Sequence, residues 1–220
     1  MSYKSVVFDL DGTLLNSLED IANGVNAVFK EHGYSPVKIE EIRQFVGDGA
    51  FNLIKRALNS TDVTLPDGKT AALKDEYIDR YTQFQNLQSQ PYKGVISLLN
   101  NLQQSGIPIG IITNKPQHLL EKIVDQFFSD IRFLMLIGHN EFHALKPDPA
   151  SAFEFSRRCG YSCENIILVG DSCVDIETAV RANMFPVGVA WGFQDCELLI
   201  KAGARKVLSD PLELCELMEL

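Results

Sequence analysis

Two aspartates, Asp9 and Asp11, stand two positions apart directly after a short apolar run at residues 5–8. Taken alone, an Asp-x-Asp segment is often only the turn that ends a strand, with Asp11 and Gly12 as turn residues. Carboxylates at the end of a buried strand can also serve as a nucleophile, as a proton donor or acceptor, or as ligands of a hard cation. Which interpretation holds depends on the other side chains that reach the same place.

A second pair of aspartates, Asp171 and Asp175, follows another apolar run at residues 166–169. If both runs are parallel strands of one sheet, Asp9 and Asp171 project from the same edge. Two ionised carboxylates about 4 Å apart repel by about 4 kcal/mol at an effective dielectric constant near 20, so the cluster persists only if a cation binds or one group holds a proton. Carboxylate oxygens and a backbone carbonyl suit Mg²⁺, which also binds substrate phosphate. The pattern therefore predicts a magnesium site.

Two further segments supply groups that fit a phosphate. Thr113 and Asn114 follow an apolar run at residues 107–112, and a helix-like stretch starts soon after them. A hydroxyl and free backbone N–H groups at a helix start can bind phosphoryl oxygens. Lys146 lies in a proline-rich loop, where a fixed ammonium could stabilise charge on a transferring phosphoryl group. Alone, Thr113 could be a helix N-cap and Lys146 a surface residue, but the aspartates favour the catalytic interpretation.

Short apolar runs that alternate with helix-like stretches must position these residues. The runs lack strict polar alternation, which is typical of strands buried on both faces of a parallel sheet. This order indicates a doubly wound parallel sheet of the α/β class. The expected strands are residues 5–8, 107–112, 133–137, 166–169 and 187–191. The expected helices between them are residues 95–104, 117–128, 150–158, 176–182 and 197–202.

The interval between the first two expected strands contains no convincing strand but has helix-like stretches at residues 18–30, 50–58 and 69–83. In the first stretch, apolar residues recur on one helical face, and Ser17 is a plausible N-cap. The apolar residues of that face are Ile21, Val25, Val28 and Phe29.

We interpret residues 17–87 as a small α-helical cap domain inserted into a core domain of residues 1–16 and 88–220. An insertion after the first strand leaves the sheet at the edge where ligands bind in such folds. It is therefore placed to act as a lid.

Composition excludes several classes of protein. Of 220 residues, 45% are hydrophobic and 22% are charged, which is the balance of a globular chain and not of a disordered one. A net charge of −9 disfavours nucleic acid and anionic membranes as partners, and no apolar run is long enough to span a bilayer. The five cysteines are odd in number and are expected to be reduced structural thiols. We expect a cytoplasmic protein whose oligomeric state the sequence leaves open.

Taken in order, the four polar segments resemble the four motifs of the haloacid dehalogenase superfamily. The resemblance covers essentially the whole chain, and the helical insertion is similar to the α-helical cap of that superfamily's phosphatases. Three further segments, at residues 45–50, 111–116 and 191–193, resemble phosphoglycolate phosphatase and its close relatives. The four motifs are Asp9-Leu10-Asp11-Gly12-Thr13, Thr113-Asn114, Lys146-Pro147 and Gly170-Asp171-x-x-x-Asp175.

This resemblance implies a Mg²⁺-dependent phosphatase that hydrolyses a small phosphorylated metabolite through an aspartyl-phosphate. Asp9 would attack phosphorus. Asp11 would protonate the leaving alkoxide and later take a proton from the hydrolytic water. Asp9, the backbone carbonyl of Asp11, and Asp171 would hold the Mg²⁺.

The same resemblance assigns the remaining roles. Thr113, with nearby N–H groups and Asn114, would bind the substrate's phosphoryl oxygens. Lys146 would stabilise the nucleophile and the transferred group, as phosphoryl transfer generally requires. Asp175 would orient Lys146 or a metal-bound water.

The loop Gly47-Asp48-Gly49 precedes the helix-like stretch at residues 50–58. By resemblance it is the substrate-specificity loop, whose three residues would contact substrate; a loop-to-helix turn with Asp48 as N-cap explains it almost as well. From the resemblance, we expect a neutral polar residue at the position of Asp48 in many relatives. The negative charge of Asp48 could disfavour a substrate with its own carboxylate, which puts phosphoglycolate itself in question.

Three alternatives compete with the phosphatase hypothesis. A β-phosphoglucomutase-like mutase would return the phosphoryl group to a sugar phosphate, and a pyrophosphatase would cleave pyrophosphate on the same scaffold. Gly170, at a position where such mutases tend to carry an additional acidic residue, favours hydrolysis. A catalytically silent binding module is disfavoured because every reactive position is intact.

Overall fold

A computed structural model describes residues 3–84, 88–140 and 142–220 of the chain. Contacts divide it into two units: Met1–Asn16 together with Pro91–Leu220, and Ser17–Gln90. None of the helices in the described ranges combines the length and apolar character that crossing a membrane would need.

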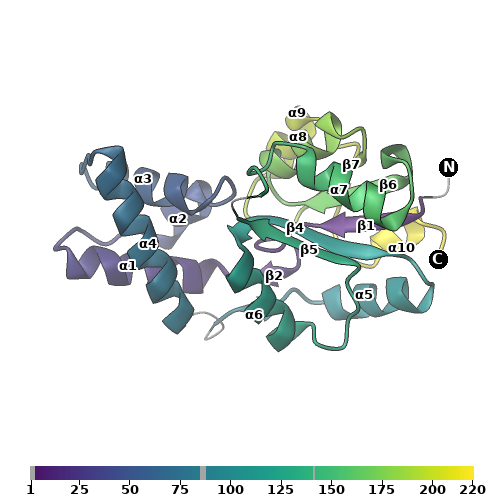
Figure 1. The fold of residues 1–220 in the computed structure, drawn as a ribbon, viewed down its shortest axis with the longest axis horizontal. Helices are drawn as coiled ribbons and strands as arrows, with labels where there is room; N and C mark the ends of the chain where they lie inside the picture. The colour runs from purple at the N-terminus through teal and green to yellow at the C-terminus, as the bar shows by residue number, and fades with distance from the viewer. Residues whose placement is uncertain (1–2, 85–87, 141) are drawn as a thin grey trace. The chain divides into compact units, whose positions relative to one another are not determined.

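The larger unit is built on a six-stranded sheet with the order β5-β4-β1-β6-β7-β8, in which every pair of neighbours runs parallel. Starting from β1, the chain adds strands on one side and then returns to add β6 on the other. This sheet, drawn in Figure 1, confirms the expected α/β class. The strands are β1 (Ser5–Phe8), β4 (Ile109–Pro116), β5 (Met135–His139), β6 (Ile166–Gly170), β7 (Phe185–Val189) and β8 (Lys206–Leu208).

Helices cover both faces of this sheet, because successive side chains of a strand point to opposite faces. Val6 and Phe8 of β1 pack with α5, α6 and α10, whereas Val7 packs with α7 and α8. Figure 1 shows α5 and α6 on one side of the sheet and α7 and α8 on the other. The helices are α5 (Val95–Gln104), α6 (Gln117–Phe127), α7 (Ala150–Cys159), α8 (Cys173–Arg181), α9 (Cys196–Ala202) and α10 (Glu213–Leu217), with a short 3₁₀ turn at Cys163–Asn165.

Some elements differ from the sequence-based expectation. The second expected strand starts two residues later, at Ile109, and continues through polar residues to Pro116, where apolar patterning gives no signal. Phe185–Val189 lies two residues earlier than expected because Pro186 and Gly188 interrupt its apolar run. The edge strand β8 was missed because only one of its three residues is buried.

The smaller unit, Ser17–Gln90, is helical in the described residues. The apolar face predicted for the first helix is confirmed, because all four of its residues are buried. Ser17 occupies the N-cap position, but its side chain makes no capping hydrogen bond. The second helix was missed because it is short and only Ile42 in it is buried. The helices are α1 (Leu18–Glu31), α2 (Ile39–Phe45), α3 (Ala50–Ser60) and α4 (Asp67–Phe84).

The chain passes between the units through two short paired strands, β2 (Leu15–Asn16) and β3 (Gln90–Pro91). Nearby, the backbone N–H of Tyr92 donates to the carbonyl of Leu14 at 3.1 Å. Two-residue strands are too short to show a periodic pattern of apolar residues, so sequence patterning does not predict them.

A buried carboxylate, Asp20, ties the first turn of α1 to the returning segment of the same unit. Its oxygens accept hydrogen bonds from the backbone N–H of Gln88 at 3.1 Å and from the N–H and hydroxyl of Ser89 at 2.9 and 2.5 Å. Asp20 and Ser89 are both buried, so the two donors of Ser89 depend on this carboxylate in place of water.

We expect Asp20→Ala to raise the hydrogen-exchange rate of the Ser89 amide at least about tenfold. A hydrogen bond to a charged group contributes about 1.5–3 kcal/mol, and each 1.4 kcal/mol corresponds to a factor of ten. Native-state exchange measured by NMR checks this, with Asp79→Ala on the exposed face of α4 as the control. Equal Ser89 exchange in the wild type and both variants would contradict the role given to Asp20.

Candidate active site

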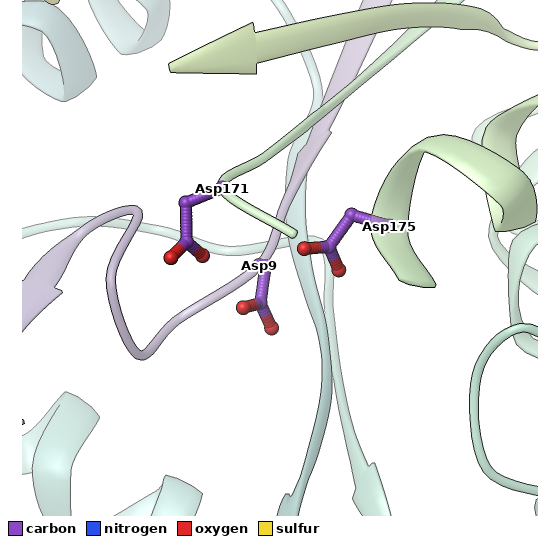
Figure 2. Close-up of side chains that lie close together, drawn as sticks. All are labelled: Asp9, Asp171 and Asp175. Carbon is purple, nitrogen blue, oxygen red and sulfur yellow. The ribbon is translucent and has the colours of Figure 1, made fainter. Parts of the chain in front are cut away.

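Three carboxylates converge at the carboxyl edge of the sheet, between β1 and β6. This is where strand order reverses and where open α/β sheets bind ligands. Asp9 follows β1, Asp171 follows β6, and Asp175 lies in the first turn of α8; Figure 2 shows the three side chains together. One oxygen from each lies within 4.8 Å of the others. The Asp9 N–H donates to the Val169 carbonyl at 2.9 Å, which extends the strand pairing into the site.

Asp171 is held by two donors and enclosed by backbone. The Thr13 hydroxyl donates to its Oδ1 at 3.1 Å, and the Phe193 N–H donates to its Oδ2 at 2.8 Å. A Cβ on Gly12 or on Gly192 would lie 2.1 Å from atoms of the Asp171 side chain. Gly12 also has φ +86°, so both space and backbone conformation require glycine there.

The ammonium of Lys146 joins two of the carboxylates. Its Nζ donates to Asp9 Oδ1 at 2.7 Å, to Asp175 Oδ1 at 2.5 Å and to the carbonyl of Ile112 at 2.9 Å. Burial lowers the pKa of Lys146, but the charges of Asp175 and Asp9 outweigh it, so the pKa lies above its ordinary value. Lys146 therefore stays protonated and neutralises part of the cluster's negative charge.

Asp175 has a supporting geometry. Its Oδ1 accepts from Lys146, and its Oδ2 accepts from the backbone N–H and the hydroxyl of Ser172 at 3.0 and 2.5 Å. A Cβ on Gly170 would lie 2.2 Å from the Cβ of Asp175, so backbone packs directly on this carboxylate. Both oxygens are thus committed within the protein, which suits a residue that orients Lys146.

Asn114 has a partner other than the expected substrate. Its buried side-chain amide accepts from the backbone N–H of Lys146 at 2.7 Å and donates to the Lys146 carbonyl at 3.1 Å. The peptide bond between Lys146 and Pro147 is cis. Asn114 therefore holds the backbone of the Lys146 loop through its side-chain amide. The hydroxyl of the preceding residue, Thr113, accepts a hydrogen bond from the Lys115 N–H at 3.3 Å.

Asp11 pairs with Lys115, a residue that the sequence reasoning did not select. Nζ of Lys115 donates to both oxygens of Asp11, at 3.0 and 2.9 Å, and only 6% and 12% of the two side chains are exposed. The signal was available, because Lys115 directly follows Thr113 and Asn114. The same reasoning also missed Thr13, which binds Asp171.

The electrostatics of the site favour a divalent cation. Desolvation by burial raises the pKa of Asp9 to about 7 against the opposing charge of Lys146, and burial with the charges of Asp175 and Asp9 raises the pKa of Asp171. Fully ionised, the four aspartates exceed the two lysines by two negative charges. Carboxylate oxygens are hard ligands, so the donor set fits Mg²⁺ at Asp9 and Asp171.

The Gly47-Asp48-Gly49 loop lies within the helical unit, where Asp48 forms an ion pair. Arg56 of α3 donates to both Asp48 oxygens, at 2.8 and 2.5 Å, and to the carbonyl of Phe45 at 3.1 Å. Gly49, not Asp48, occupies the N-cap of α3, so the simple capping interpretation is wrong. Gly47 and Gly49 have φ values of +131° and +94°, which other residues rarely adopt.

Comparison with known proteins gives a consistent result. The profile of the haloacid dehalogenase-like hydrolase family matches residues 6–189. The phosphoglycolate phosphatase of Xanthomonas campestris pv. campestris is 33% identical over 191 residues, covering 87% of this chain and 85% of that protein. The phosphoglycolate phosphatase of Pasteurella multocida is 34% identical, with 87% of each chain covered.

Solved structures show the same fold. A Lactobacillus delbrueckii protein superposes with a TM-score of 0.91 at 26% identity, covering 99% of both chains. A haloacid dehalogenase-like family hydrolase from Streptococcus pneumoniae has a TM-score of 0.84 at 22% identity, covering 98% of both chains. The resemblance inferred from the four motifs is confirmed: this chain belongs to the haloacid dehalogenase-like hydrolases and is similar, within them, to the phosphoglycolate phosphatases.

Proposed function

We propose that this protein is a Mg²⁺-dependent phosphatase that hydrolyses a small phosphomonoester through an aspartyl-phosphate on Asp9. The observation that carries the proposal is the placement of Asp9. Its Oδ1 is fixed by Lys146, whereas its Oδ2 has no hydrogen-bond donor among the described residues. A carboxylate held through one oxygen presents the other to an electrophile.

In the first step Asp9 would form a bond to phosphorus while the bond from phosphorus to the substrate's ester oxygen breaks. Asp11 would give its proton to that leaving oxygen. Lys146 would stabilise the charge on the transferring group, and the Thr113 hydroxyl would donate to a phosphoryl oxygen. A bound Mg²⁺, held by Asp9, Asp171 and the backbone carbonyl of Asp11, would neutralise phosphoryl charge.

In the second step water would attack phosphorus and Asp11 would accept its proton. The bond between phosphorus and Asp9 then breaks, which releases inorganic phosphate and regenerates the Asp9 carboxylate. Asp171 is given no proton transfer in this scheme: its oxygens accept from the Thr13 hydroxyl and the Phe193 N–H, and its proposed role is to hold the cation.

The packing around Gly170 supports hydrolysis over a mutase reaction. An additional acidic residue at this position would place its Cβ 2.2 Å from the Cβ of Asp175, and Asp175 is fixed by Lys146 and Ser172. Such a residue could be accommodated only if Asp175, which binds the Lys146 ammonium, moved. The sequence-based preference for a phosphatase thus gains a packing reason.

The Arg56 pair also bears on the substrate. An isolated Asp48 carboxylate would repel a substrate that carries its own carboxylate, but the guanidinium of Arg56 neutralises it in the helical unit. We therefore retain phosphoglycolate, which the relatives are named for, as the first substrate to test, and keep the Gly47-Asp48-Gly49 loop of the helical unit as the segment that would contact it.

Replacing the proposed nucleophile tests the mechanism. Asp9→Asn should lower kcat at least about 10³-fold, because an amide cannot form the acyl phosphate. Phosphate release and acid-quench trapping of phosphorylated protein measure the effect, and circular dichroism checks the fold. Asp125→Asn, on the exposed face of α6, is the matched control. Activity of Asp9→Asn above a tenth of the wild-type level would exclude Asp9 as nucleophile.

A panel of substrates tests the reaction class. With Mg²⁺ present, phosphoglycolate and related small phosphomonoesters should release inorganic phosphate in proportion to the alcohol formed. Incubation with β-glucose 1-phosphate should give free phosphate and no isomerised sugar phosphate, as judged by ³¹P NMR. Isomerisation without phosphate release would establish the mutase, and turnover of pyrophosphate alone would establish the pyrophosphatase.

The raised pKa values predict how metal binding depends on pH. In metal-free protein the buried Asp9 has a pKa of about 7 against an ordinary 3.8, so the folded state binds more protons than the unfolded state between these values. Stability of the metal-free protein should therefore fall as pH rises through this window. Mg²⁺ must displace the protons that the buried aspartates hold at lower pH. Added Mg²⁺ should therefore raise the melting temperature of the protein more at pH 8 than at pH 6.

Thermal unfolding with chelator and with added Mg²⁺ measures this difference. Chelator should also abolish phosphatase activity reversibly. An equal Mg²⁺-induced shift at both pH values would mean that the cation does not bind at the buried aspartates.

A further inference from the structure

The contact between Lys115 and Asp11 has no part in the reaction as set out above. Lys115 is buried, and its ammonium reaches both oxygens of one carboxylate in a two-point contact at 3.0 and 2.9 Å. The pair joins residues 104 apart in the sequence, one from the end of β4 and one from the loop after β1. It therefore links two strand ends that carry different parts of the candidate site.

The loop that carries Asp11 is also held by backbone contacts. The N–H groups of Thr13, Leu14 and Leu15 all donate to the Leu10 carbonyl, at 3.2, 2.9 and 3.0 Å. These contacts set the path of the chain but not the rotation of the Asp11 side chain about its own bonds. A donor that reaches both carboxylate oxygens restricts that rotation.

The anchor of Lys115 is itself rigid. The residue belongs to β4, its N–H is bonded to the Thr113 hydroxyl, and the preceding Asn114 holds the Lys146 loop through both ends of its amide. A proton-transfer group needs a fixed position relative to the reacting atoms, because a misplacement of about 1 Å can cost about 100-fold in rate. Lys115 reaches the Asp11 carboxylate from this anchored segment of β4.

We propose that Lys115 is a positioning residue that acts through Asp11 and holds its carboxylate where it transfers protons in both steps. This inference rests on the proposed function, since Asp11 has a proton to transfer only if the site hydrolyses a phosphate ester. Lys115 itself does not touch phosphorus in this scheme, so its loss affects the reaction only as far as Asp11 does.

A double-mutant cycle tests this dependence. We compare the wild type, Asp11→Asn, Lys115→Met and the double variant with p-nitrophenyl phosphate, whose leaving group departs without a proton. Lys115→Met should lower steady-state turnover about 10–100-fold in the wild-type background and less than about twofold in the Asp11→Asn background, because interacting residues are not additive. Equal losses in both backgrounds would overturn the proposal.

The two chemical steps give a second readout. With the aryl phosphate, the rate of phosphoenzyme formation in Lys115→Met should stay within about threefold of wild type, while phosphorylated protein accumulates because its hydrolysis still needs Asp11. Rapid-quench trapping measures both. Equal slowing of formation and hydrolysis would indicate a general distortion of the site and would contradict the inference.

Two further variants complete the design. Lys115→Arg keeps donors for both Asp11 oxygens, so it should recover most of the activity that Lys115→Met loses. It also replaces Lys115→Met in the comparison if that variant does not fold. A folded Lys115→Arg that is no more active than Lys115→Met would count against the positioning role. Lys122→Met on the exposed face of α6 is the matched control and should behave as wild type. If the wild-type protein forms no phosphoenzyme, the proposed function fails, and this result is distinct from a Lys115 variant that matches an active wild type.

Discussion

The buried ammonium of Lys146 is the contact on which the rest of the candidate site depends. Its three acceptors lie just after β1, within β4 and in α8, so one side chain connects segments that are remote in the sequence. Carboxylates brought together in a buried place repel, and burial of an unpaired charge is costly. The pairing of Lys146 with Asp9 and Asp175 makes the close approach of the aspartates tolerable before any cation binds.

Glycine residues packed against the aspartates are the second constraint on the site. Gly12 and Gly192 lie where any Cβ would meet Asp171, and Gly170 lies where a Cβ would meet Asp175. The carboxylates are therefore enclosed by main chain that approaches closely and, for Asp171, donates a hydrogen bond from Phe193. Such enclosure fixes the side chains by packing, and it raises the pKa of Asp171 by removing water.

The fold and the clustering of Asp9 with Asp171 could both be predicted from sequence patterns, but for different reasons. Buried parallel strands leave short apolar runs, so β1 and β6 could be located, and the rule that parallel strands end at one edge brings Asp9 and Asp171 together. Pairings between polar side chains leave no such trace. The hydrogen bonds of Asn114 to Lys146 and the ion pair of Asp48 with Arg56 follow from the three-dimensional path of the chain, and these partners differ from the substrate contacts that the resemblance implies for both residues.

At the end of β4, two neighbouring residues contact different parts of the candidate site. Successive side chains of a strand point in opposite directions, so neighbouring residues can serve different parts of a site. Asn114 reaches the Lys146 loop, whereas Lys115 reaches Asp11 after β1. A shift of one residue in the register of β4 would exchange these directions and break both contacts at once. The parallel pairing of β4 with β1 ends at Ile111 opposite Phe8, so it sets the point from which the segment that carries Asn114 and Lys115 continues past β1.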